Sequence, residues 1–351
     1  MNPTLPISHE DIPTKVIHSE APFFVIGADR SGTTLLRLML NEHPRLHVPR
    51  ESYFLRDLAL NVDPERPLTP SEVREALRIV RTHPRWPDWG ITDDVLEEAM
   101  GGLGSSAPLL RDIVDRLFRL SSERDGKPRW GDKTPMYIHH IDRIHRIFPE
   151  SKVLHLVRDG RDVAVSLRRI PWHGSTVLAA AAYWSRSVEQ GMDRGRPLGE
   201  LYREFRYEDL VLDPRGTLEA ICDFLGEEFH PRMLRFHSTA AEEIAPWERT
   251  LHTKVVRPPA ASDVERWRRE MTPSQVLVFE AMAGRAMDAL GQHRRFQGLS
   301  RAGTAVAAIP LRAAWKLVRI KRAFGLSTPK WMGRIWQAAT GDATRAAKHG
   351  A

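Results

Sequence analysis

A short glycine-containing loop between two apolar segments most constrains how this chain folds. Residues 22–26 (PFFVI) have the pattern of a buried strand, and residues 33–40 (TTLLRLML) have the length and opening threonines of a helix. The loop that joins them, GADRSGTT at 27–34, has glycines for a tight turn, and the helix N-terminus directs backbone N–H groups at an anion. The pattern indicates a phosphate loop, with a plain strand–turn–helix connection as the alternative.

Strand and helix patterns alternate along the rest of the chain. This order predicts an α/β fold, a P-loop-type parallel sheet flanked by helices, with the ligand site at the carboxyl ends of the strands. A helix is expected to end near 148–149, and residues 60–128 are polar and helical in pattern, as in an insertion. The further strands are expected at 46–48, 152–157 and 204–207, and the further helices at 161–169 and 214–225.

The side chains of the phosphate loop favour an anion other than a nucleoside triphosphate. Ser31, Thr33 and Thr34 add hydroxyl donors, and Arg30 adds a fixed cation. In the Walker pattern GxxxxGK[ST] a lysine stands where this chain has Thr33, which argues against ATP or GTP hydrolysis. We therefore expect an adenylate-like donor without the usual triphosphate and Mg²⁺ arrangement.

A second strand–turn–helix connection follows at VRDGRDVAVS, residues 157–166. Arg158 stands at the end of the expected strand, and Ser166 lies eight residues later on the following helix. Together they could hold one phosphate from two sides with charge-assisted hydrogen bonds. The alternative is a surface cluster of ion pairs among the arginines and aspartates of this segment, which would contribute little to stability.

The first loop resembles the 5′-phosphosulfate loop of sulfotransferases that use 3′-phosphoadenosine 5′-phosphosulfate (PAPS). The stretch RSGTTLLRLML at 30–40, continuing to His43-Pro44, is most similar to the tyrosylprotein-sulfotransferase-like branch and its bacterial relatives. Asp29 departs from the family pattern, which has proline there, and we expect its side chain to point away or to cap a helix. The resemblance covers residues 22 to about 290 and implies the sulfotransferase fold with PAPS as co-substrate.

The same resemblance implies a set of donor-binding residues. The segment from Arg158 to Ser166 resembles the family's 3′-phosphate loop, and Tyr207 precedes an acidic pair as in the family. Lys254 lies in a segment, 247–257, that resembles the late loop closing over the donor. The implied donor-binding residues are Arg30, Ser31, Gly32, Thr33, Thr34, Arg158, Ser166, Tyr207 and Lys254.

The resemblance also implies three catalytic residues, namely Glu51, Lys133 and Arg30. Lys133, in WGDKTP, matches the family's lysine that assists the leaving group, and Glu51, in PRESY, matches the tyrosylprotein branch's catalytic glutamate. Solvated surface charge is the alternative for both. Tyr53 replaces the branch's peptide-binding arginine, which makes a peptide acceptor less favoured.

Histidine is the base in cytosolic steroid and phenol sulfotransferases, so His139, His140 and His155 compete with Glu51 for that role. His155 lies within an apolar strand pattern, which favours a core position. No set of histidine and acidic residues has metal-ligand spacing, so no metal is expected.

The cysteine content and the apolar segments of the chain indicate the cellular compartment in which it works. The single cysteine, Cys222, excludes an internal disulfide, and the longest apolar run, 177–184, is far below the roughly 20 residues of a membrane span. The first residues lack a basic region followed by an apolar one, so no signal peptide is expected. A cytoplasmic location follows as the expectation.

Charge is distributed unevenly along the chain. Residues 300–351 hold ten basic residues and one acid, a net charge of +9, whereas the whole chain carries +7. The remaining residues therefore carry −2, which removes the main argument for a nucleic-acid binder. We expect an N-terminal arm at 1–21, a sulfotransferase domain at 22–299 that includes the insertion at 60–128, and a basic amphipathic helical tail at 300–351.

The tail places basic residues beside an apolar stripe, and three interpretations stay open. It could lie on an anionic membrane, which would place the protein peripherally on the inner face of the membrane. It could instead dock its apolar stripe on the enzyme body. An RNA-binding tail is the third interpretation, although the segment contains no recognisable module.

Taken together, the sequence predicts a sulfotransferase that moves the sulfonate group of PAPS to a hydroxyl acceptor by in-line transfer. The acceptor could be a carbohydrate, a lipid-linked sugar or a small molecule, with a peptide less favoured. One alternative is a P-loop kinase-like phosphotransferase, which Thr33 disfavours. The other is a non-catalytic nucleotide-fold adaptor at a membrane or nucleic acid, which would not need both Glu51 and Lys133.

Overall fold

The computed structural model describes residues 21–101, 107–168, 170, 176–244 and 254–296. Within these ranges five strands form one parallel sheet in the order β2-β3-β1-β4-β5. Because all five strands run in one direction, the residues that follow β1, β3 and β4 meet at one edge of the sheet. The strands are β1 (Phe23–Ile26), β2 (Leu46–His47), β3 (Arg129–Lys133), β4 (Lys152–Val157) and β5 (Tyr202–Arg206).

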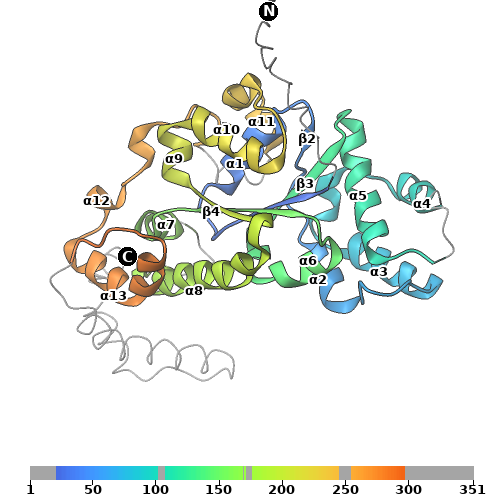
Figure 1. Cartoon of the computed structure of the whole chain (residues 1–351), viewed down its shortest axis with the longest axis horizontal. Helices are drawn as coiled ribbons and strands as arrows, with labels where there is room; N and C mark the ends of the chain where they lie inside the picture. The colour runs from blue at the N-terminus through green and yellow to red at the C-terminus, as the bar shows by residue number, and fades with distance from the viewer. Residues whose placement is uncertain (1–20, 102–106, 169, 171–175, 245–253, 297–351) are drawn as a thin grey trace, which may run out of the picture.

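Helices cover both faces of the sheet, so the predicted α/β fold is confirmed (Figure 1). Alternate residues of β1 enter the two cores, with Phe23 and Val25 on one face and Phe24 and Ile26 on the other. The first face is covered by α1 (Thr33–Asn41), α9 (Tyr207–Leu212), α10 (Pro214–Leu225), η5 (Pro231–Ser238) and α11 (Ala240–Glu243). The second is covered by α2 (Phe54–Asn61), α5 (Leu110–Arg124), η2 (Pro135–His139), α6 (Ile141–Ile147) and α8 (Val177–Gly195).

A third group of helices packs beside the second phosphate loop. Helix α7 (Gly160–Leu167) lies against α8 and α13 (Pro273–Ala289), and their apolar residues form a separate core cluster around Trp184 and Phe279. A Cβ on Gly160 would lie 2.5 Å from the Trp184 ring, so the helix backbone contacts that ring directly. The short elements η4 (Arg196–Leu201), η7 (Ala261–Asp263) and α12 (Trp267–Glu270) complete this side.

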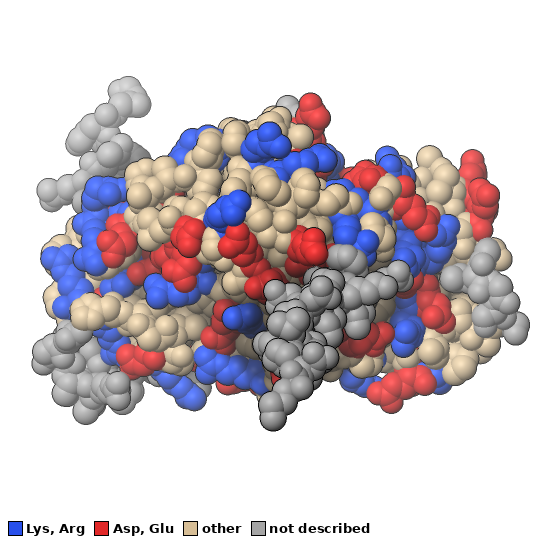
Figure 2. All heavy atoms as spheres, turned by 45° about the horizontal axis from the view of Figure 1, so that its top comes forward, with Lys and Arg blue, Asp and Glu red and all other residues tan. Residues whose placement is uncertain are grey.

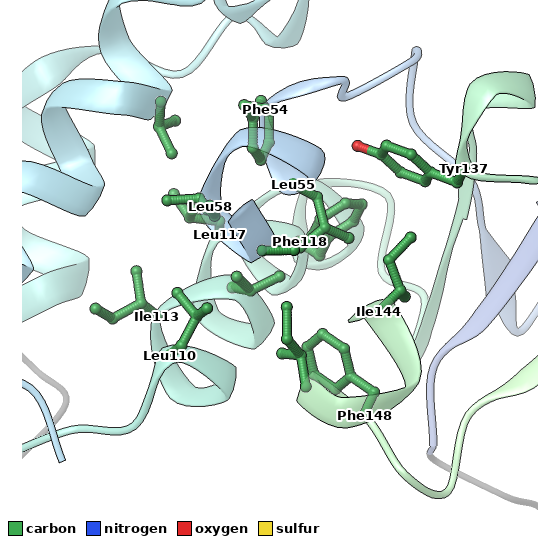
Figure 3. Packing of buried hydrophobic residues seen from close by; sticks show 14 of the residues in the cluster. Phe54, Leu55, Leu58, Leu110, Ile113, Leu117, Phe118, Tyr137, Ile144 and Phe148 are labelled. Atoms are coloured by element: carbon green, nitrogen blue, oxygen red, sulfur yellow. The ribbon is translucent and has the colours of Figure 1, made fainter. Parts of the chain in front are cut away.

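Most of the segment expected as a helical insertion is helical. It contains α3 (Pro70–Thr82), η1 (Trp86–Trp89), α4 (Asp93–Gly101) and α5. Thr69 caps α3 through a reciprocal capping box with Glu72, which satisfies backbone donors at the helix start. Figure 3 shows Phe54 and Leu58 of α2 against the α5 residues Leu117 and Phe118. Phe118 also stacks on Trp130 of β3, with ring centroids 4.2 Å apart, so the helices are anchored to the sheet.

Strand β3 (RWGDK) is the strand of the described sheet that the apolar pattern did not predict. Its residues are fully or almost fully buried, and its charged side chains are all paired. The Arg129 guanidinium donates to Glu227 Oε1 at 3.0 Å and to the Leu225 carbonyl at 2.8 Å, and the Trp130 indole donates to Asp115 Oδ1 at 2.8 Å. Partners far away in the sequence make a polar strand possible at the centre of the molecule.

Several element boundaries differ from the sequence prediction by one or two residues. Strand β5 ends at Arg206 instead of 207, because Tyr207 already begins helix α9. Helix α7 begins at Gly160, one residue early, because the side chain of its N-cap Asp159 accepts a hydrogen bond from the Arg161 amide.

The basic tail at 300–351 and residues 1–20 of the predicted arm lie outside the described residues. In the part of the chain that the structure describes, no helix is long and apolar enough to cross a membrane. On the face seen in Figure 2, basic and acidic side chains are interspersed over the surface, consistent with the small net charge of residues 1–299.

Candidate active site

The predicted phosphate loop makes a tight turn between β1 and α1. A Cβ on Gly27 would lie 2.6 Å from the carbonyl oxygen of Leu156. Gly32, the N-cap of α1, has a φ of 98°, and a Cβ there would lie 2.3 Å from the Tyr207 ring. Only glycine fits both positions, so the loop backbone lies directly against β4 and the Tyr207 ring.

The phosphate loop contains buried hydroxyl groups, and one of them is free to donate a hydrogen bond to a ligand. Ser31 and Thr33 are buried, and the Ser31 hydroxyl has no hydrogen-bond partner among the described residues. Buried hydroxyls are normally paired, so this one is available to a ligand. Helix α1 has no acidic residue in its first turn, and its N-terminus adds a partial positive charge. The turn therefore suits an anion.

The two predicted loops meet through Arg30. Its Nε donates to Ser166 Oγ at 3.0 Å, and its carbonyl accepts a hydrogen bond from Arg158 Nη1 at 3.3 Å. Arg30 has a positive φ of 70°, a conformation that non-glycine residues adopt mainly where the surrounding structure holds them. Burial, together with the nearby Arg158 charge, lowers the pKa of Arg30 from its ordinary value. Two cations and a hydroxyl thus converge at the sheet edge.

Arg158 is held by several groups but keeps one donor. Its guanidinium lies over the Tyr207 ring, 4.1 Å from the centroid, and Nη2 donates to the Asp263 carbonyl at 2.9 Å and to Asp162 Oδ2 at 3.3 Å. Its Nε is buried and has no partner within the described ranges. The side chain is therefore oriented by protein contacts while one N–H stays available to an anion.

Within the second loop, Arg161 and Asp159 do form ion pairs, as in the alternative interpretation of that segment. Arg161 pairs with Asp159 at 2.7 Å and with Glu280 at 2.8 Å, and its guanidinium lies 3.8 Å from the Trp267 ring centroid. This cluster is buried and not on the surface, because the Arg161 and Glu280 side chains are 5% and 1% exposed. Arg161 is therefore held by protein groups, whereas Arg158 Nε has no partner among the described residues.

Lys254 is linked to Arg158 through Asp263. Lys254 and Arg257 both pair with Asp263 Oδ1, at 2.7 and 2.8 Å, and the backbone carbonyl of Asp263 binds Arg158. Residues 247–253 of the predicted late loop lie outside the described residues. Asp263 was not found from the sequence, because nothing in the pattern around it marks a link to Arg158.

Glu51 and Lys133 form an ion pair beside the phosphate loop. Lys133 Nζ bonds to Glu51 Oε1 and also donates to Thr34 Oγ1 at 3.3 Å. The Lys133 and Glu51 side chains are 4% and 15% exposed, so the solvated-surface alternative is wrong for this pair. The arrangement places a carboxylate and an ammonium group next to the first turn of α1.

The charge of Asp29 acts on two tyrosines, Tyr53 and Tyr183, of which Tyr53 also feels the charge of Glu51. Burial and the charge of Glu51 raise the pKa of the Tyr53 hydroxyl, and the charge of Asp29 adds to the shift. The Tyr183 hydroxyl accepts a hydrogen bond from the Asp29 amide at 3.0 Å, and burial and the Asp29 charge raise its pKa. Asp29 does not cap α1, whose N-cap is Gly32, and its charge acts on the two tyrosines.

The three competing histidines occupy different surroundings. His155 is fully buried in β4, its Nδ1 lies 2.5 Å from the Tyr202 hydroxyl, and burial lowers its pKa to about 4. His139 Nδ1 lies 2.6 Å from Gln190 Oε1, and burial lowers the pKa of both His139 and His140. His155 is a core residue, as its apolar surroundings in the sequence indicated.

Across the described ranges there is no cluster of three or more histidine, cysteine, aspartate or glutamate side chains that could hold a metal ion. The residues that do converge suit an anionic nucleotide. The unpaired Ser31 hydroxyl and Arg158 Nε are two buried donors from which an anionic group can accept hydrogen bonds.

Comparison with known proteins places this geometry in context. A model described as "Sulfotransferase family" matches residues 22–231, more than half of the chain. Protein-tyrosine sulfotransferase 1 of Danio rerio is 28% identical over 219 residues, which cover 60% of this chain and 54% of the relative. An uncharacterized protein of Aquifex aeolicus is 29% identical over 263 residues, 72% of this chain and 31% of that protein.

A solved structure supports the same grouping. The sulfotransferase domain from the Synechococcus PCC 7002 olefin synthase is 26% identical with a TM-score of 0.53, and the alignment covers 76% of this chain and 96% of that domain. The chain spans between about a third and a half of the length of the two relatives named above, so their activities describe longer proteins.

Proposed function

The chain belongs to the sulfotransferase family, and on that basis we propose that it transfers the sulfonate group of PAPS to a hydroxyl acceptor. One observation carries the proposal. The Glu51–Lys133 ion pair lies beside a phosphate loop whose Arg30 also contacts Ser166 of a second anion-binding segment. A donor with anionic groups at both its 5′ and 3′ ends matches two such segments at one sheet edge.

In this proposal two groups of residues bind the PAPS donor, one at each of its anionic ends. The 5′-phosphosulfate is held by Arg30, Ser31, Gly32, Thr33 and Thr34, through the loop amides, hydroxyls and guanidinium. The 3′-phosphate is held by Arg158 and Ser166, with Lys254 closing from the late segment. The Tyr207 ring supports the arrangement, because it lies close to Gly32 and under the Arg158 guanidinium.

The proposed chemistry is an in-line displacement at sulfur. Glu51 takes the proton of the acceptor hydroxyl while the acceptor oxygen forms a bond to sulfur. The bond from sulfur to the bridging phosphate oxygen breaks, and 3′-phosphoadenosine 5′-phosphate (PAP) leaves. Lys133 and Arg30 stabilise the negative charge that collects on the sulfonate and the leaving oxygen.

The two other functions considered for this chain find less support. A kinase-like phosphotransferase would lack the Walker lysine, because Thr33 occupies that position. A non-catalytic adaptor has no use for a Glu51–Lys133 pair that is almost fully buried beside the phosphate loop. A sulfonate transfer uses both features.

We propose a neutral hydroxyl compound as the acceptor, either a carbohydrate, a lipid-linked sugar or a small molecule. The tyrosine sulfotransferase relatives point to peptides, but this chain has Tyr53 where that branch has a peptide-binding arginine. Here burial raises the pKa of the Tyr53 hydroxyl, and the charges of Glu51 and Asp29 both raise it further. A site with two carboxylates disfavours an acidic peptide, because like charges repel.

We further propose that the enzyme works in the cytoplasm and that its basic tail, 300–351, brings it to an anionic membrane surface. The net charge of +9 on the tail supports this interpretation. A nucleic-acid partner is not proposed, because residues 1–299 carry a net charge of only −2.

The test is a transfer assay with PAPS and a panel of acceptors. The panel contains methyl glycosides, a phenol, a polyprenol-linked sugar and an acidic tyrosine peptide, and mass spectrometry follows the gain of one SO₃ group. We expect transfer to at least one neutral acceptor with release of PAP, and no transfer when ATP replaces PAPS. Phosphate transfer from ATP without any transfer from PAPS would overturn the proposal.

A further inference from the structure

The chain neighbours of Glu51 and Lys133 belong to a closed network of buried hydroxyls around one carboxylate. Ser52 follows Glu51 in the chain, and Asp132 precedes Lys133 on β3. The Ser52 hydroxyl donates to Asp132 Oδ2 at 2.5 Å, and the Thr134 hydroxyl donates to Asp132 Oδ1 at 2.9 Å. Each member of the catalytic pair is therefore the chain neighbour of a network residue.

The network continues away from the site to Tyr137. The Tyr137 hydroxyl lies 2.6 Å from Ser52 Oγ, and the Ser52 amide donates to Thr134 Oγ1 at 3.2 Å. Because the Ser52 hydroxyl donates its proton to Asp132, the Tyr137 hydroxyl is the donor to Ser52. Tyr137 belongs to the same buried cluster as Phe54 and Ile144, all labelled in Figure 3, so its ring is packed in the apolar core.

Burial makes this network costly unless every member is satisfied. Ser52, Asp132, Thr134 and Tyr137 are all 0% exposed. Losing one partner leaves a buried hydroxyl or carboxylate unpaired, which destabilises the fold, and more so where the unpaired group is charged. The charged groups that act on Asp132 are Glu51 on the β2–α2 connection and its own neighbour Lys133, and Asp132 in turn acts on Tyr137 of η2.

The backbone around Glu51 needs such an anchor. Glu51 lies in the connection between β2 and α2, outside regular structure, and the next residue but one, Tyr53, has a strained φ of 50°. No ladder hydrogen bond of the sheet fixes this connection, since β2 ends at His47. The side-chain and amide hydrogen bonds of Ser52 attach it to β3 and to the residue after it.

We propose that Ser52 and Asp132 are positioning residues, which hold Glu51 against Lys133 by joining the two chain segments that carry the pair. They act through Glu51 and contact no reacting atom. The inference rests on the proposed role of Glu51 as the base, and it adds the device that fixes the orientation of that base. A carboxylate misplaced by about 1 Å loses much of its catalytic effect.

The experiment is a double-mutant cycle of Ser52→Ala and Glu51→Gln, with transfer from PAPS to the acceptor found in the panel as the rate readout. We expect Ser52→Ala to lower kcat about ten-fold in the native background and less than two-fold in the Glu51→Gln background. The Kd for PAP stays within about two-fold in both. Equal losses of kcat in the two backgrounds would show a general structural effect and overturn the inference.

The matched control is Ser151→Ala, which also removes a buried hydroxyl. Ser151 is fully buried, and its Oγ donates to the Phe148 carbonyl at 2.7 Å, at the opposite end of β4. We expect a loss of stability similar to that of Ser52→Ala but an unchanged kcat. Tyr137→Phe removes the far end of the network and serves as a second variant, with a smaller loss of kcat expected.

A second readout keeps the inference separate from the proposed activity. Crystal structures of the native chain and of Ser52→Ala report the distance from Glu51 to Lys133 whether or not an acceptor is known. We expect that distance to exceed 4 Å in Ser52→Ala and the Ser151→Ala control to keep the contact. An intact ion pair in Ser52→Ala would overturn the inference, whereas absence of transfer in the native enzyme would overturn only the proposed function.

Discussion

Arg30 donates a hydrogen bond from Nε to Ser166 Oγ at 3.0 Å, although the two residues are 136 positions apart in the chain. Arg30 belongs to the loop after β1, and Ser166 lies on the helix after β4. The pairing of β1 with β4 brings these segments together, because both strands end at the same sheet edge. The sheet order thus unites two motifs that the sequence presents separately.

The first prediction concerns the proposed base. We expect Glu51→Gln to lower kcat by about 10²–10⁴-fold while the Kd for PAP changes little, because a general base acts in the transition state. Lys133→Ala should lower kcat strongly as well. Steady-state kinetics and calorimetric titration with PAP measure the two quantities. A near-normal kcat for Glu51→Gln would transfer the role of base to a histidine, with His139 as the first candidate.

The second prediction is a pH dependence of stability that comes from Asp132. Burial raises the pKa of Asp132 to about 7, above the value of about 4 in an unfolded chain. Because the pKa is raised, the folded state binds this proton more tightly than the unfolded chain does. The contribution of Asp132 to the free energy of unfolding is therefore fully present below about pH 4 and is lost as the pH rises towards 7. The free energy of unfolding should therefore fall between pH 5 and pH 7, by about 2 kcal/mol from this group.

Urea unfolding at these two pH values, with the native chain and Asp132→Asn, measures that contribution. We expect the decrease with pH to be smaller in Asp132→Asn by about the same 2 kcal/mol, because asparagine does not titrate. The comparison removes the contributions of all other titrating groups. An identical pH dependence in the two proteins would mean that Asp132 does not take up a proton on folding in this range.

The third prediction concerns acceptor charge. Asp29 and Glu51 place negative charge near Tyr53, so acidic peptides should be poor acceptors for the native enzyme. Tyr53→Arg combined with Asp29→Asn should raise kcat/KM for an acidic tyrosine peptide by about ten-fold relative to a neutral acceptor. Paired assays with an acidic and a neutral peptide of equal length measure the ratio. An unchanged ratio would remove these two residues from acceptor selection.

The fourth prediction concerns the tail. Each basic residue near an anionic surface contributes about 1 kcal/mol of attraction, and the effect falls off within a Debye length. The full chain should therefore sediment with vesicles rich in phosphatidylserine or phosphatidylglycerol, whereas a chain ending at Leu299 should stay in solution. Raising the salt concentration should release the full chain. Equal behaviour of both chains, or unfolding of the shorter one, would assign the tail a structural role.

The sequence was sufficient for the parts of the site that follow local rules. The loop at 27–34 follows an apolar strand and precedes an apolar helix, so its position could be predicted from periodicity and from glycine placement alone. The same holds for the segment from Arg158 to Ser166. Their meeting at one edge follows from the parallel alternation of strands and helices, which is a fold-level rule.

The parts that the sequence did not predict depend on distant partners. Strand β3 is polar, and it is buried only because Arg129 finds Glu227, 98 positions away, and Asp132 finds Ser52, 80 positions away. No periodicity marks such pairs, since each residue alone has the pattern of a surface group. The motif WGDKTP identified Lys133 as a candidate. The role of its neighbour Asp132 can be inferred only from the hydroxyl groups that surround it in the structure.

The most direct test of this account is the affinity of the chain for PAP compared with ADP and ATP, measured by calorimetry and by thermal unfolding. PAP should bind at least about ten-fold more tightly than either, since only PAP carries the 3′-phosphate assigned to Arg158 and Ser166. At a concentration of about 100 times its Kd, PAP should stabilise the fold by about 2.7 kcal/mol. Ser166→Ala should reduce the preference for PAP. Equal affinities of the native chain for PAP and ATP would contradict the assignment of PAPS as the donor.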